Sequence, residues 1–347
     1  MKGEMIAAVM PKTREIEMQK RPIPVPKDNE VLVKIKHVGL CGSDMHFYEY
    51  GRIGSVVMDS PTVLGHESAG EIVEVGKNVK NLSVGDRVAL EPGVPCGKCE
   101  FCKEGKYNLC PDVAFMACPG YDGAFAEYVA YPSDMAFKLP ANVDTVEGGL
   151  IEPLAVGFHA VSQSGVRAGQ KAVVLGSGCI GLVTLMVLKM IGVSEVYVVD
   201  VIAKRLEMAK ELGATKVLKA DEVDVEKTIK ELTGNGADAV FETAGNKITT
   251  LQTAHLVKSG GVVTIVGMGV DPVIPYDISA LVWKEATIKT VFRYRNLYPT
   301  AIKAVAAGQI PLKKIATHYF DFANLKEAID YNIENKSEVI KAVIKFE

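Results

Sequence analysis

The sequence predicts an α/β protein whose first part is mainly β and whose second part is a doubly wound parallel sheet. Two patterns support this fold class. Up to about residue 150, short apolar runs are separated by glycines and prolines, as in a small β unit with long loops. From residue 171 onward, short strands alternate with helices, which is typical of βαβ units. The length of 347 residues suits two domains of roughly 100–200 residues each.

The first part is expected to consist of strands and turns. Apolar side chains at Val31, Val33 and Ile35 recur with the period of two that a strand requires. Further short apolar runs that predict strands lie at 68–75, 87–90 and 125–131. Glycines and prolines punctuate the sequence between these runs, and they predict the turns.

The second part is expected to alternate between strands and helices. The strands are predicted at 171–175, 195–199, 216–218, 237–241, 262–266 and 287–292. The helices are predicted at 180–191, 204–212, 225–233 and 247–258. The tail after residue 292 predicts helices at 299–307 and 325–332 and a strand at 339–346, and this tail could return to pack on the first part.

Composition excludes several classes of function. The chain has 42 acidic and 39 basic residues, so its net charge of −3 argues against a nucleic-acid partner. Hydrophobic residues make up 48% and charged residues 23%, which excludes wholesale disorder. The N-terminus lacks the apolar core of a signal peptide, and the longest uncharged stretch, 172–188, is shorter than a bilayer span. We therefore expect a cytoplasmic protein with no membrane partner.

A glycine motif predicts a dinucleotide site in the second part. Gly176, Gly178 and Gly181 fit G-x-G-x-x-G between a predicted strand and a predicted helix, where pyrophosphate would meet the helix N-terminus. Asp200 ends the next strand, 19 residues after Gly181, where a carboxylate accepts ribose hydroxyls and disfavours a 2′-phosphate. The pattern predicts a Rossmann domain that prefers NAD to NADP, although Lys204 and Arg205 weaken that preference. An ordinary glycine-rich turn is the disfavoured alternative.

Four of the seven cysteines predict a closed metal site. Cys96, Cys99, Cys102 and Cys110 give the spacing C-x2-C-x2-C-x7-C, and four thiolates from one loop suit tetrahedral zinc. An iron–sulfur cluster is the main alternative, but the ferredoxin run has three residues before its fourth cysteine, and here there are seven. A site of four cysteines has no open position, so its predicted role is structural.

A second set of ligands predicts a different metal site. Cys41 is followed 25 residues later by His66, with Glu67 beside it, and Glu152 could join them. Each piece alone is more often structural. Together they offer a thiolate, an imidazole and carboxylates, and three protein ligands with an open position are the arrangement of a catalytic zinc.

With these residues in view, the whole chain resembles the zinc-dependent medium-chain alcohol dehydrogenases, and within them the polyol branch typified by sorbitol (L-iditol) dehydrogenase. The segments that support the resemblance are CGSDMHFYEYGRIG from Cys41, VLGHESAGEIVEVG from Val63, VGDRVALEPG from Val84, CGKCEFCKEGKYNLC from Cys96, LIEPLAVGFHA from Leu150, VFRYRN from Val291 and the pair Thr317-His318. EPG, AVGFHA and VFRY point to the polyol branch in particular.

The resemblance implies a fold and two metal sites. It implies a mainly β, chaperonin-10-like (GroES-like) catalytic domain made of residues 1–152 and 293–347, with a Rossmann domain of residues 153–292 inserted into it. Cys41, His66 and Glu67 would hold the catalytic zinc, with Glu152 bound directly or through water. The four clustered cysteines would hold a structural zinc.

The resemblance also implies roles for other residues. Ser43 and His46 match the proton relay, and Glu152 adjoins the metal. Residues near the substrate would be Phe47, Phe115, Glu152, Arg293 and Tyr294. NAD contacts would be Gly176, Gly178, Ile180, Gly181, Asp200, Arg205, Val266, Gly267, Met268, Val291, Phe292 and Arg293. Two positions depart from the mammalian pattern, since Phe47 replaces a tyrosine and Cys118 a threonine, and both changes remove hydrogen-bonding capacity.

The implied activity is the oxidation of a polyol of the sorbitol, xylitol or L-iditol type to its 2-ketose, and the reverse, by hydride transfer with zinc and NAD. The partner would be a small polyol or ketose, and a homo-oligomer is expected, a tetramer rather than a dimer. The alternatives within the superfamily are a 2,3-butanediol or L-threonine dehydrogenase. A non-catalytic dinucleotide-binding protein is a remote alternative, because the catalytic-zinc residues are all present.

Overall fold

The computed structural model describes residues 2–269 and 273–347, and the chain divides into two compact units. Unit 1 comprises Met1–Glu152, Tyr298–Gly308 and Leu312–Glu347, and unit 2 comprises Pro153–Leu297 and Gln309–Pro311. Residues 293–297, which the sequence assigns to the first domain, therefore lie in unit 2. The chain re-enters unit 1 at Tyr298, a fully buried residue whose hydroxyl donates to the carbonyl of Leu90 at 3.0 Å. No described helix has the length and apolar character to cross a membrane.

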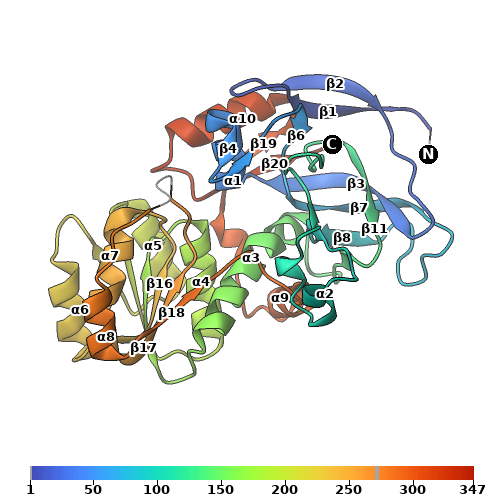
Figure 1. Ribbon diagram of the computed structural model, residues 1–347. Coiled ribbons are helices and arrows are strands. Elements are labelled where there is room, and N and C mark those ends of the chain that lie inside the picture. The colour runs from blue at the N-terminus through green and yellow to red at the C-terminus, as the bar shows by residue number, and fades with distance from the viewer. Residues whose placement is uncertain (1, 270–272) are drawn as a thin grey trace. The chain divides into compact units, whose positions relative to one another are not determined.

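Unit 1 is built on a seven-stranded sheet. The order of its strands is β12-β8-β7-β3-β20-β19, and β11 also pairs with β3. Strands β3 and β7 run antiparallel side by side, as Figure 1 shows, and β20 from the end of the chain pairs with β3. A second sheet has the order β2-β1-β6, and two short two-stranded sheets, β4-β5 and β9-β10, complete the unit. The tail therefore packs on the first part, as the sequence suggested.

The strands of unit 1 are β1 (Glu4–Met10), β2 (Glu17–Pro22), β3 (Glu30–Gly39), β4 (Arg52–Ile53), β5 (Val56–Val57), β6 (Thr62–Val63), β7 (Glu67–Val75), β8 (Arg87–Leu90), β9 (Gly93–Val94), β10 (Ala114–Phe115), β11 (Tyr128–Pro132), β12 (Ala136–Lys138), β19 (Ala316–Asp321) and β20 (Lys341–Lys345). Its helices are α1 (Gly42–Tyr50), α2 (Glu100–Lys103), α9 (Tyr298–Ala306), α10 (Leu325–Glu334) and the 3₁₀ turns η1 (Tyr107–Leu109), η2 (Leu312–Ile315) and η3 (Phe322–Asn324).

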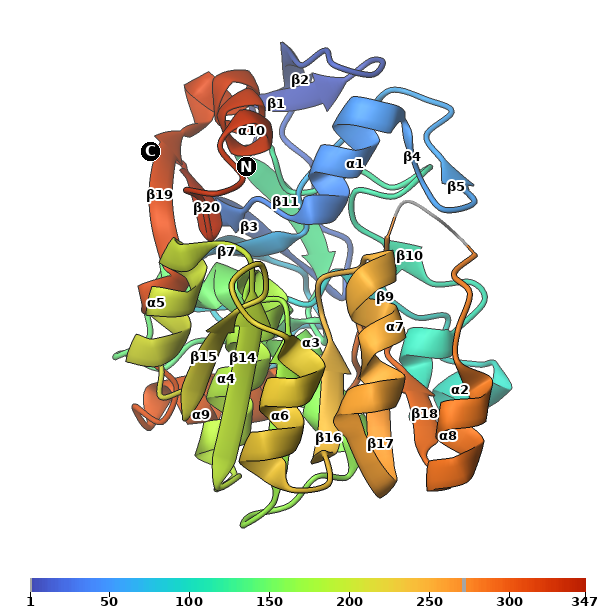
Figure 2. The ribbon, with the colours of Figure 1, turned by 90° about the vertical axis from the view of Figure 1, so that its left-hand side faces the viewer.

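Two helices add to the expectation that the first 150 residues are mainly strands and turns. Helix α1 lies beside the β4-β5 hairpin (Figure 2). Helix α3 (Thr145–Ser164) is the longest in the described chain and crosses the boundary between the units. Its sequence contains Pro153 and several glycines, which signal a break, but nearly every residue of its central part is buried. Tertiary packing outweighs local propensity here.

The core of unit 1 lies between the main sheet and the elements that cover it. Alternate side chains of β3, such as Val31, Val33 and Ile35, are fully buried. They pack in one cluster with the inward faces of β1, β7, β8 and β20 and with Leu325 and Ile329 of α10. The period of two in the sequence thus corresponds to a face that meets the core.

Unit 2 is a six-stranded parallel sheet with the order β15-β14-β13-β16-β17-β18. In order of sequence this is 3-2-1-4-5-6, the doubly wound arrangement in which the order reverses between β13 and β16. The strands are β13 (Lys171–Leu175), β14 (Glu195–Asp200), β15 (Lys216–Lys219), β16 (Ala237–Glu242), β17 (Val257–Ile265) and β18 (Thr287–Thr290). The helices are α4 (Cys179–Met190), α5 (Ala203–Glu211), α6 (Val225–Thr233), α7 (Lys247–Leu256) and α8 (Ile278–Lys284).

Helices cover both faces of this sheet. Figure 1 shows α6, α7 and α8 on one side of the strands and α4 on the other. Val225, Ile229, Ala254 and Leu281 from the first three helices share one buried cluster with the strands. Burial on both faces explains the continuous apolar runs of β13 and β14.

The helix predicted at 247–258 ends two residues earlier, because β17 begins at Val257. The amino group of Lys284 donates to the carbonyls of Ala254, His255 and Val257 at 2.7–3.1 Å. These bonds satisfy carbonyls at the C-terminus of α7 that have no partner within the helix. The end of the helix is therefore determined by Lys284, a residue 27 or more positions away in the sequence.

Candidate active site

Cys41 stands at the N-terminus of helix α1. Its backbone is extended, and its N–H donates to the Asp44 carboxylate at 3.0 Å, so an acidic side chain three residues along the helix fixes the turn. Asp44 is 1% exposed, and its other oxygen accepts the N–H of Gly65 at 3.0 Å. Asp44 therefore joins the start of α1 to the loop that carries His66.

His66 and Glu67 lie where the chain enters strand β7. The loop turns at Gly65, whose φ of +87° and close approach to the Phe125 ring both require glycine. His66 Nδ1 lies 3.6 Å from the Asp44 carboxylate. His66 and Glu67 are buried, at 7% and 1% exposed.

Cys41, His66 and Glu67 form one group, which we call the Cys41 group. One ligand atom from each lies within 4.8 Å of the others. A thiolate, an imidazole and a carboxylate in a cluster of this size fit zinc, with a coordination position left for a small molecule. Glu152 is not a member of the group among the described residues; it is buried in α3, at 6% exposed.

The electrostatics of the Cys41 group favour positive charge. Burial lowers the pKa of His66, but Asp44 and Cys41 outweigh burial and hold that pKa well above its usual value. The negative potential that would retain a proton on the imidazole is the property that attracts a divalent cation. Asp44 is a site residue that the sequence analysis missed; its only signal was an acid three positions after a helix cap.

The other predicted site residues of unit 1 lie on helix α1 and strand β10. Ser43 and His46 are half-buried and lie three residues apart on α1, so they share a helix face. Phe47 on the same helix is buried, at 3% exposed. The ring of Phe115, on β10, lies 5.7 Å from the His66 ring, centroid to centroid. Phe115 thus lies beside the Cys41 group.

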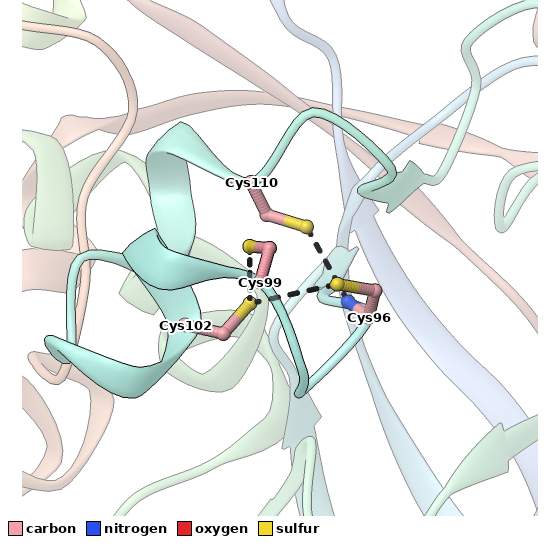
Figure 3. Close-up of side chains that lie close together, drawn as sticks. All are labelled: Cys96, Cys99, Cys102 and Cys110. Carbon is pink, nitrogen blue, oxygen red and sulfur yellow. Dashed lines mark hydrogen bonds between the residues drawn. The ribbon is translucent and has the colours of Figure 1, made fainter.

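The four clustered cysteines form the second group, the cysteine lobe (residues 96–110). Figure 3 shows their sulfur atoms directed toward a common centre. One sulfur from each residue lies within 4.8 Å of the others, with 3.4 Å between Cys99 Sγ and Cys102 Sγ. The backbone N–H groups of Lys98 and Cys99 lower the pKa of Cys96 to about 7, and these amides favour the thiolate that zinc requires. The donor set fits a closed zinc site.

In unit 2 the glycine motif occupies the turn between β13 and α4. Gly176 has a φ of +92°, and a Cβ on Gly181 would lie 1.9 Å from the carbonyl oxygen of Gly176. At Gly178, by contrast, a Cβ would meet only the Arg205 guanidinium, at 3.9 Å. The first and third glycines are thus needed for the turn and the packing, and the second leaves the backbone open to a ligand. Ile180, on the first turn of α4, is half-buried.

Asp200 ends strand β14 and is held firmly. One carboxylate oxygen accepts the N–H and hydroxyl of Ser177 at 2.6 and 2.9 Å, and the other accepts the N–H groups of Val201 and Ile202 at 2.7 and 2.9 Å. These bonds fix the carboxylate beside the glycine turn. A negative charge at this position is one that would disfavour a 2′-phosphate.

The remaining predicted cofactor residues lie at the same edge of the sheet, where β17 and β18 end. The N–H groups of Val266 and Gly267 donate to the carbonyl of Glu242, and Met268 is 69% exposed. After β18, the N–H of Val291 donates to the carbonyl of Ile265. The Arg293 guanidinium stacks over the ring of Phe292 at 4.7 Å, and Tyr294 is buried.

Glu242 is a second residue that the sequence analysis missed. Fully buried at the end of β16, it accepts the N–H groups of Ala244 and Gly245 and the hydroxyl of Thr249 at 2.7–3.0 Å. Burial raises its pKa despite these donors. Glu242 holds the loop that packs against Gly267. A glutamate that ends an apolar strand was its only sequence signal.

Known proteins match this arrangement along the whole chain. Residues 27–141 match the family described as alcohol dehydrogenase GroES-like domain, and residues 179–307 match the zinc-binding dehydrogenase family. A sorbitol dehydrogenase of Bacillus subtilis is 41% identical over 341 residues, with 98% of this chain and 97% of that protein covered. The chain belongs to the zinc-dependent medium-chain alcohol dehydrogenases, in their polyol branch. The predicted family and fold class are confirmed.

Two other relatives share nearly the full length of this dehydrogenase. An uncharacterized zinc-type alcohol dehydrogenase-like protein of Escherichia coli, YdjJ, is 47% identical over 330 residues, 93% of each chain. A crystal structure from Escherichia coli, described as ECK1772, an oxidoreductase/dehydrogenase of unknown specificity involved in membrane biogenesis, has a TM-score of 0.96 at 44% identity. It covers 99% of this chain and 100% of its own. The polyol-branch dehydrogenase is therefore an oxidoreductase acting on a CH–OH group, with zinc and NAD as the cofactors of its family.

Proposed function

We propose that the protein interconverts a polyol of the sorbitol, xylitol or L-iditol type and its 2-ketose with NAD. The observation that supports this most is the Cys41 group, whose three different ligands leave a position open for a substrate oxygen. The 41% identity to a sorbitol dehydrogenase supports the polyol class.

In this proposal Cys41, His66 and Glu67 hold the catalytic zinc, and Glu152 binds it directly or through water. Zinc supplies a Lewis acid that polarises the alcohol oxygen. Asp44 keeps the imidazole of His66 and the backbone of Cys41 in place. The cysteine lobe holds the structural zinc through Cys96, Cys99, Cys102 and Cys110.

The proton and the hydride leave the alcohol by different routes. Ser43 and His46 would carry the hydroxyl proton away from the alcohol, since both side chains are half-buried and share one face of α1. A bound NAD would supply the nicotinamide as hydride acceptor, a chemistry that is the cofactor's own. Phe47 and Phe115 supply apolar contacts for the substrate, and Arg293 and Tyr294 bind its hydroxyls.

Unit 2 binds the cofactor in this proposal. The open backbone at Gly178 receives the pyrophosphate, and Asp200 receives the ribose hydroxyls and selects NAD over NADP. Arg205, close to Gly178, contributes positive charge near the phosphates. The side chains or backbone of Ile180, Val266, Gly267, Met268, Val291, Phe292 and Arg293 line the rest of the cofactor site.

A 2,3-butanediol or L-threonine dehydrogenase is the second candidate. Phe47 and Cys118 both lack the hydroxyl of the mammalian pattern, which lowers the number of bonds available to a polyol. The test is a panel of sorbitol, xylitol, L-iditol, 2,3-butanediol and L-threonine, each with NAD and NADP. We expect the highest kcat/KM for a polyol with NAD, and a higher value for butanediol or threonine would replace the proposal with the second candidate.

Removal of metal tests the mechanism separately. We expect about two zincs per chain by metal analysis. Chelation of both should abolish polyol oxidation, and zinc should restore it. Sorbitol oxidation by a metal-free sample would overturn the mechanism, and binding of NADH without oxidation of any alcohol in the panel would favour the non-catalytic alternative.

We also propose that the protein is a cytoplasmic homo-oligomer, a tetramer rather than a dimer. Strand β18 is the last in its sheet, all four of its residues are exposed, and Trp283 and Val282 of the adjacent α8 are 88% and 71% exposed. An open sheet edge beside an apolar surface favours pairing with a second copy. Light scattering of the purified protein at micromolar concentration measures the state; a monomer would contradict the homo-oligomer, and a dimer would contradict the tetramer.

A further inference from the structure

The last strand of the chain brings a buried cation to the Cys41 group. The amino group of Lys341, on β20, lies 2.7 and 2.8 Å from the two carboxylate oxygens of Glu67. Its third bond goes to the carbonyl of Leu40 at 2.9 Å, next to Cys41 in sequence. Lys341 is 4% exposed and Glu67 is 1% exposed. An ammonium group has three donors, so all of them are used here.

This ion pair is tightly enclosed. A Cβ on Gly39 would lie 2.1 Å from Glu67 Oε2, so the carboxylate has room only because position 39 is glycine. Removal of one member of a buried ion pair leaves an uncompensated charge, which is strongly destabilising. The same carboxylate belongs to the Cys41 group, where its ligand atom lies within 4.8 Å of the other two. Glu67 thus faces both an ammonium group and the proposed metal position.

We propose that Lys341 is a positioning residue that competes with the catalytic zinc for Glu67 and keeps this ligand weakly bound. The inference rests on the proposed role of Glu67 as a zinc ligand. A cation that neutralises a carboxylate lowers the negative charge it can offer to a second cation. Without metal, the pair keeps the site formed and near neutral. With metal bound, Lys341 holds the Glu67 carboxylate in place but limits the negative charge that this carboxylate offers to the zinc.

Two consequences follow from this competition. If Lys341 is replaced by an apolar residue, Glu67 has only the metal to neutralise it, so zinc should leave more slowly. The metal-free protein should also lose more stability than the zinc-loaded protein, because only the former contains an unpaired buried carboxylate. A merely structural lysine would change both forms of the protein equally.

The test uses Lys341→Met, with Lys345→Met as the matched control. Lys345 lies on the same strand, but its side chain is 46% exposed and pairs with Asp321 at 3.0 Å on the surface. Zinc release from the holoenzyme into a chromogenic chelator is followed in both, with the zinc of the cysteine lobe as internal reference. We expect Lys341→Met to slow release of the catalytic zinc about tenfold, a change of the size that contacts around ligands produce.

Thermal melting gives the second readout. The gain in Tm between chelated and zinc-loaded protein should be larger in Lys341→Met than in wild type, by on the order of 5 °C. Lys345→Met should behave as wild type in both measurements. Lys341→Arg keeps the charge and should restore most of the wild-type release rate.

Further variants keep the test decisive if Lys341→Met does not fold. The double variant Glu67→Gln with Lys341→Met removes both charges together and should fold with weaker zinc binding than wild type. If Glu67→Gln alone releases zinc at the wild-type rate, the ligand role in the proposed function fails, and the inference fails with it. If Glu67→Gln speeds release but Lys341→Met releases zinc as fast as Lys345→Met, or Lys341→Arg releases it as slowly as Lys341→Met, only the competition by Lys341 is overturned.

Discussion

The two metal groups of unit 1 are built in opposite ways. The cysteine lobe takes four identical ligands from one stretch of 15 residues, residues 96–110, with α2 and η1 as its only regular elements. The Cys41 group takes three different ligands from the start of α1 and the start of β7, and a counter-ion that is 274 residues from Glu67 along the chain. One group is formed by a local loop and the other by the assembled sheet.

This difference matches the work expected of each group. Four soft, equivalent ligands close the coordination sphere and serve stability. Mixed ligands leave a position open, and their geometry depends on residues such as Asp44 and Lys341 that do not bind metal themselves. A local group should therefore respond to changes within its loop, and a long-range group to changes across the fold.

Glu91 is a buried acid that contacts the cysteine lobe. Its carboxylate is 2% exposed and accepts the hydroxyl of Tyr107, a residue of the cysteine lobe, at 2.6 Å. Burial raises the pKa of Glu91 to about 7; the Tyr107 bond lowers it and the charge of Glu152 raises it further. This carboxylate therefore responds to the cysteine lobe through Tyr107 and to the charge of Glu152 in α3.

The largest effect is expected at Cys41, a ligand of the group with an open coordination position. Replacement of Cys41 by serine should lower kcat/KM for the preferred alcohol by about 10³-fold or more, since a bound Lewis acid contributes several kcal/mol. Metal analysis should show loss of one zinc per chain and retention of the other. Unchanged activity with that zinc lost would remove the catalytic role from the Cys41 group.

The next effect concerns the stability that depends on the buried Glu91 carboxylate, tested through pH. A raised pKa means that the folded state holds the proton more tightly, so wild type should lose stability as pH rises from about 4.5 to about 7. Glu91→Gln has no such loss. Between pH 4.5 and a pH above 7, its free energy of unfolding should therefore rise relative to that of wild type by on the order of 3 kcal/mol. Unfolding free energies at pH 5, 6, 7 and 8 measure it. Glu104→Gln, an exposed change in the cysteine lobe, is the control, and parallel curves for Glu91→Gln and wild type would contradict the raised pKa of Glu91.

A smaller effect is expected from a residue that only positions the ligands. Asp44→Asn keeps the size of the side chain but removes the charge near His66, and it should lower zinc affinity or kcat about 10–100-fold. Chelator competition and steady-state kinetics measure the change. The exposed Asp59→Asn should have no effect; equal behaviour of the two variants would show that the negative charge at Asp44 is not needed.

The smallest effect on activity is expected in the cysteine lobe. Cys102→Ser should release the structural zinc and make residues 96–110 easier to cleave in limited proteolysis, because the loop has little other support. We expect kcat to stay within about tenfold of wild type, since the Cys41 group does not share these ligands. Loss of activity as large as that of Cys41→Ser would show that the two groups are not independent.

The sequence determined the features that depend on neighbours along the chain. The G-x-G-x-x-G turn, the strand ending in Asp200 and the four clustered cysteines all have signals within a few residues, because a turn or a short loop fixes their geometry. The alternation of strands and helices likewise predicted the parallel sheet of unit 2. Helices α1 and α3 were not predicted, because their glycines and Pro153 locally disfavour a helix. Tertiary packing, which the local sequence does not show, forms these helices.

Only the tertiary structure decided what surrounds the ligands. Asp44 and Glu242 were ordinary acidic residues in the sequence, and Lys341 was one of the many lysines of the tail. Strand β20 lies beside β3, which ends next to Cys41, so Lys341 reaches Glu67 from the far end of the chain. Sequence spacing carries no record of such a contact, because pairing between distant strands is chosen by the burial of whole faces rather than by local signals.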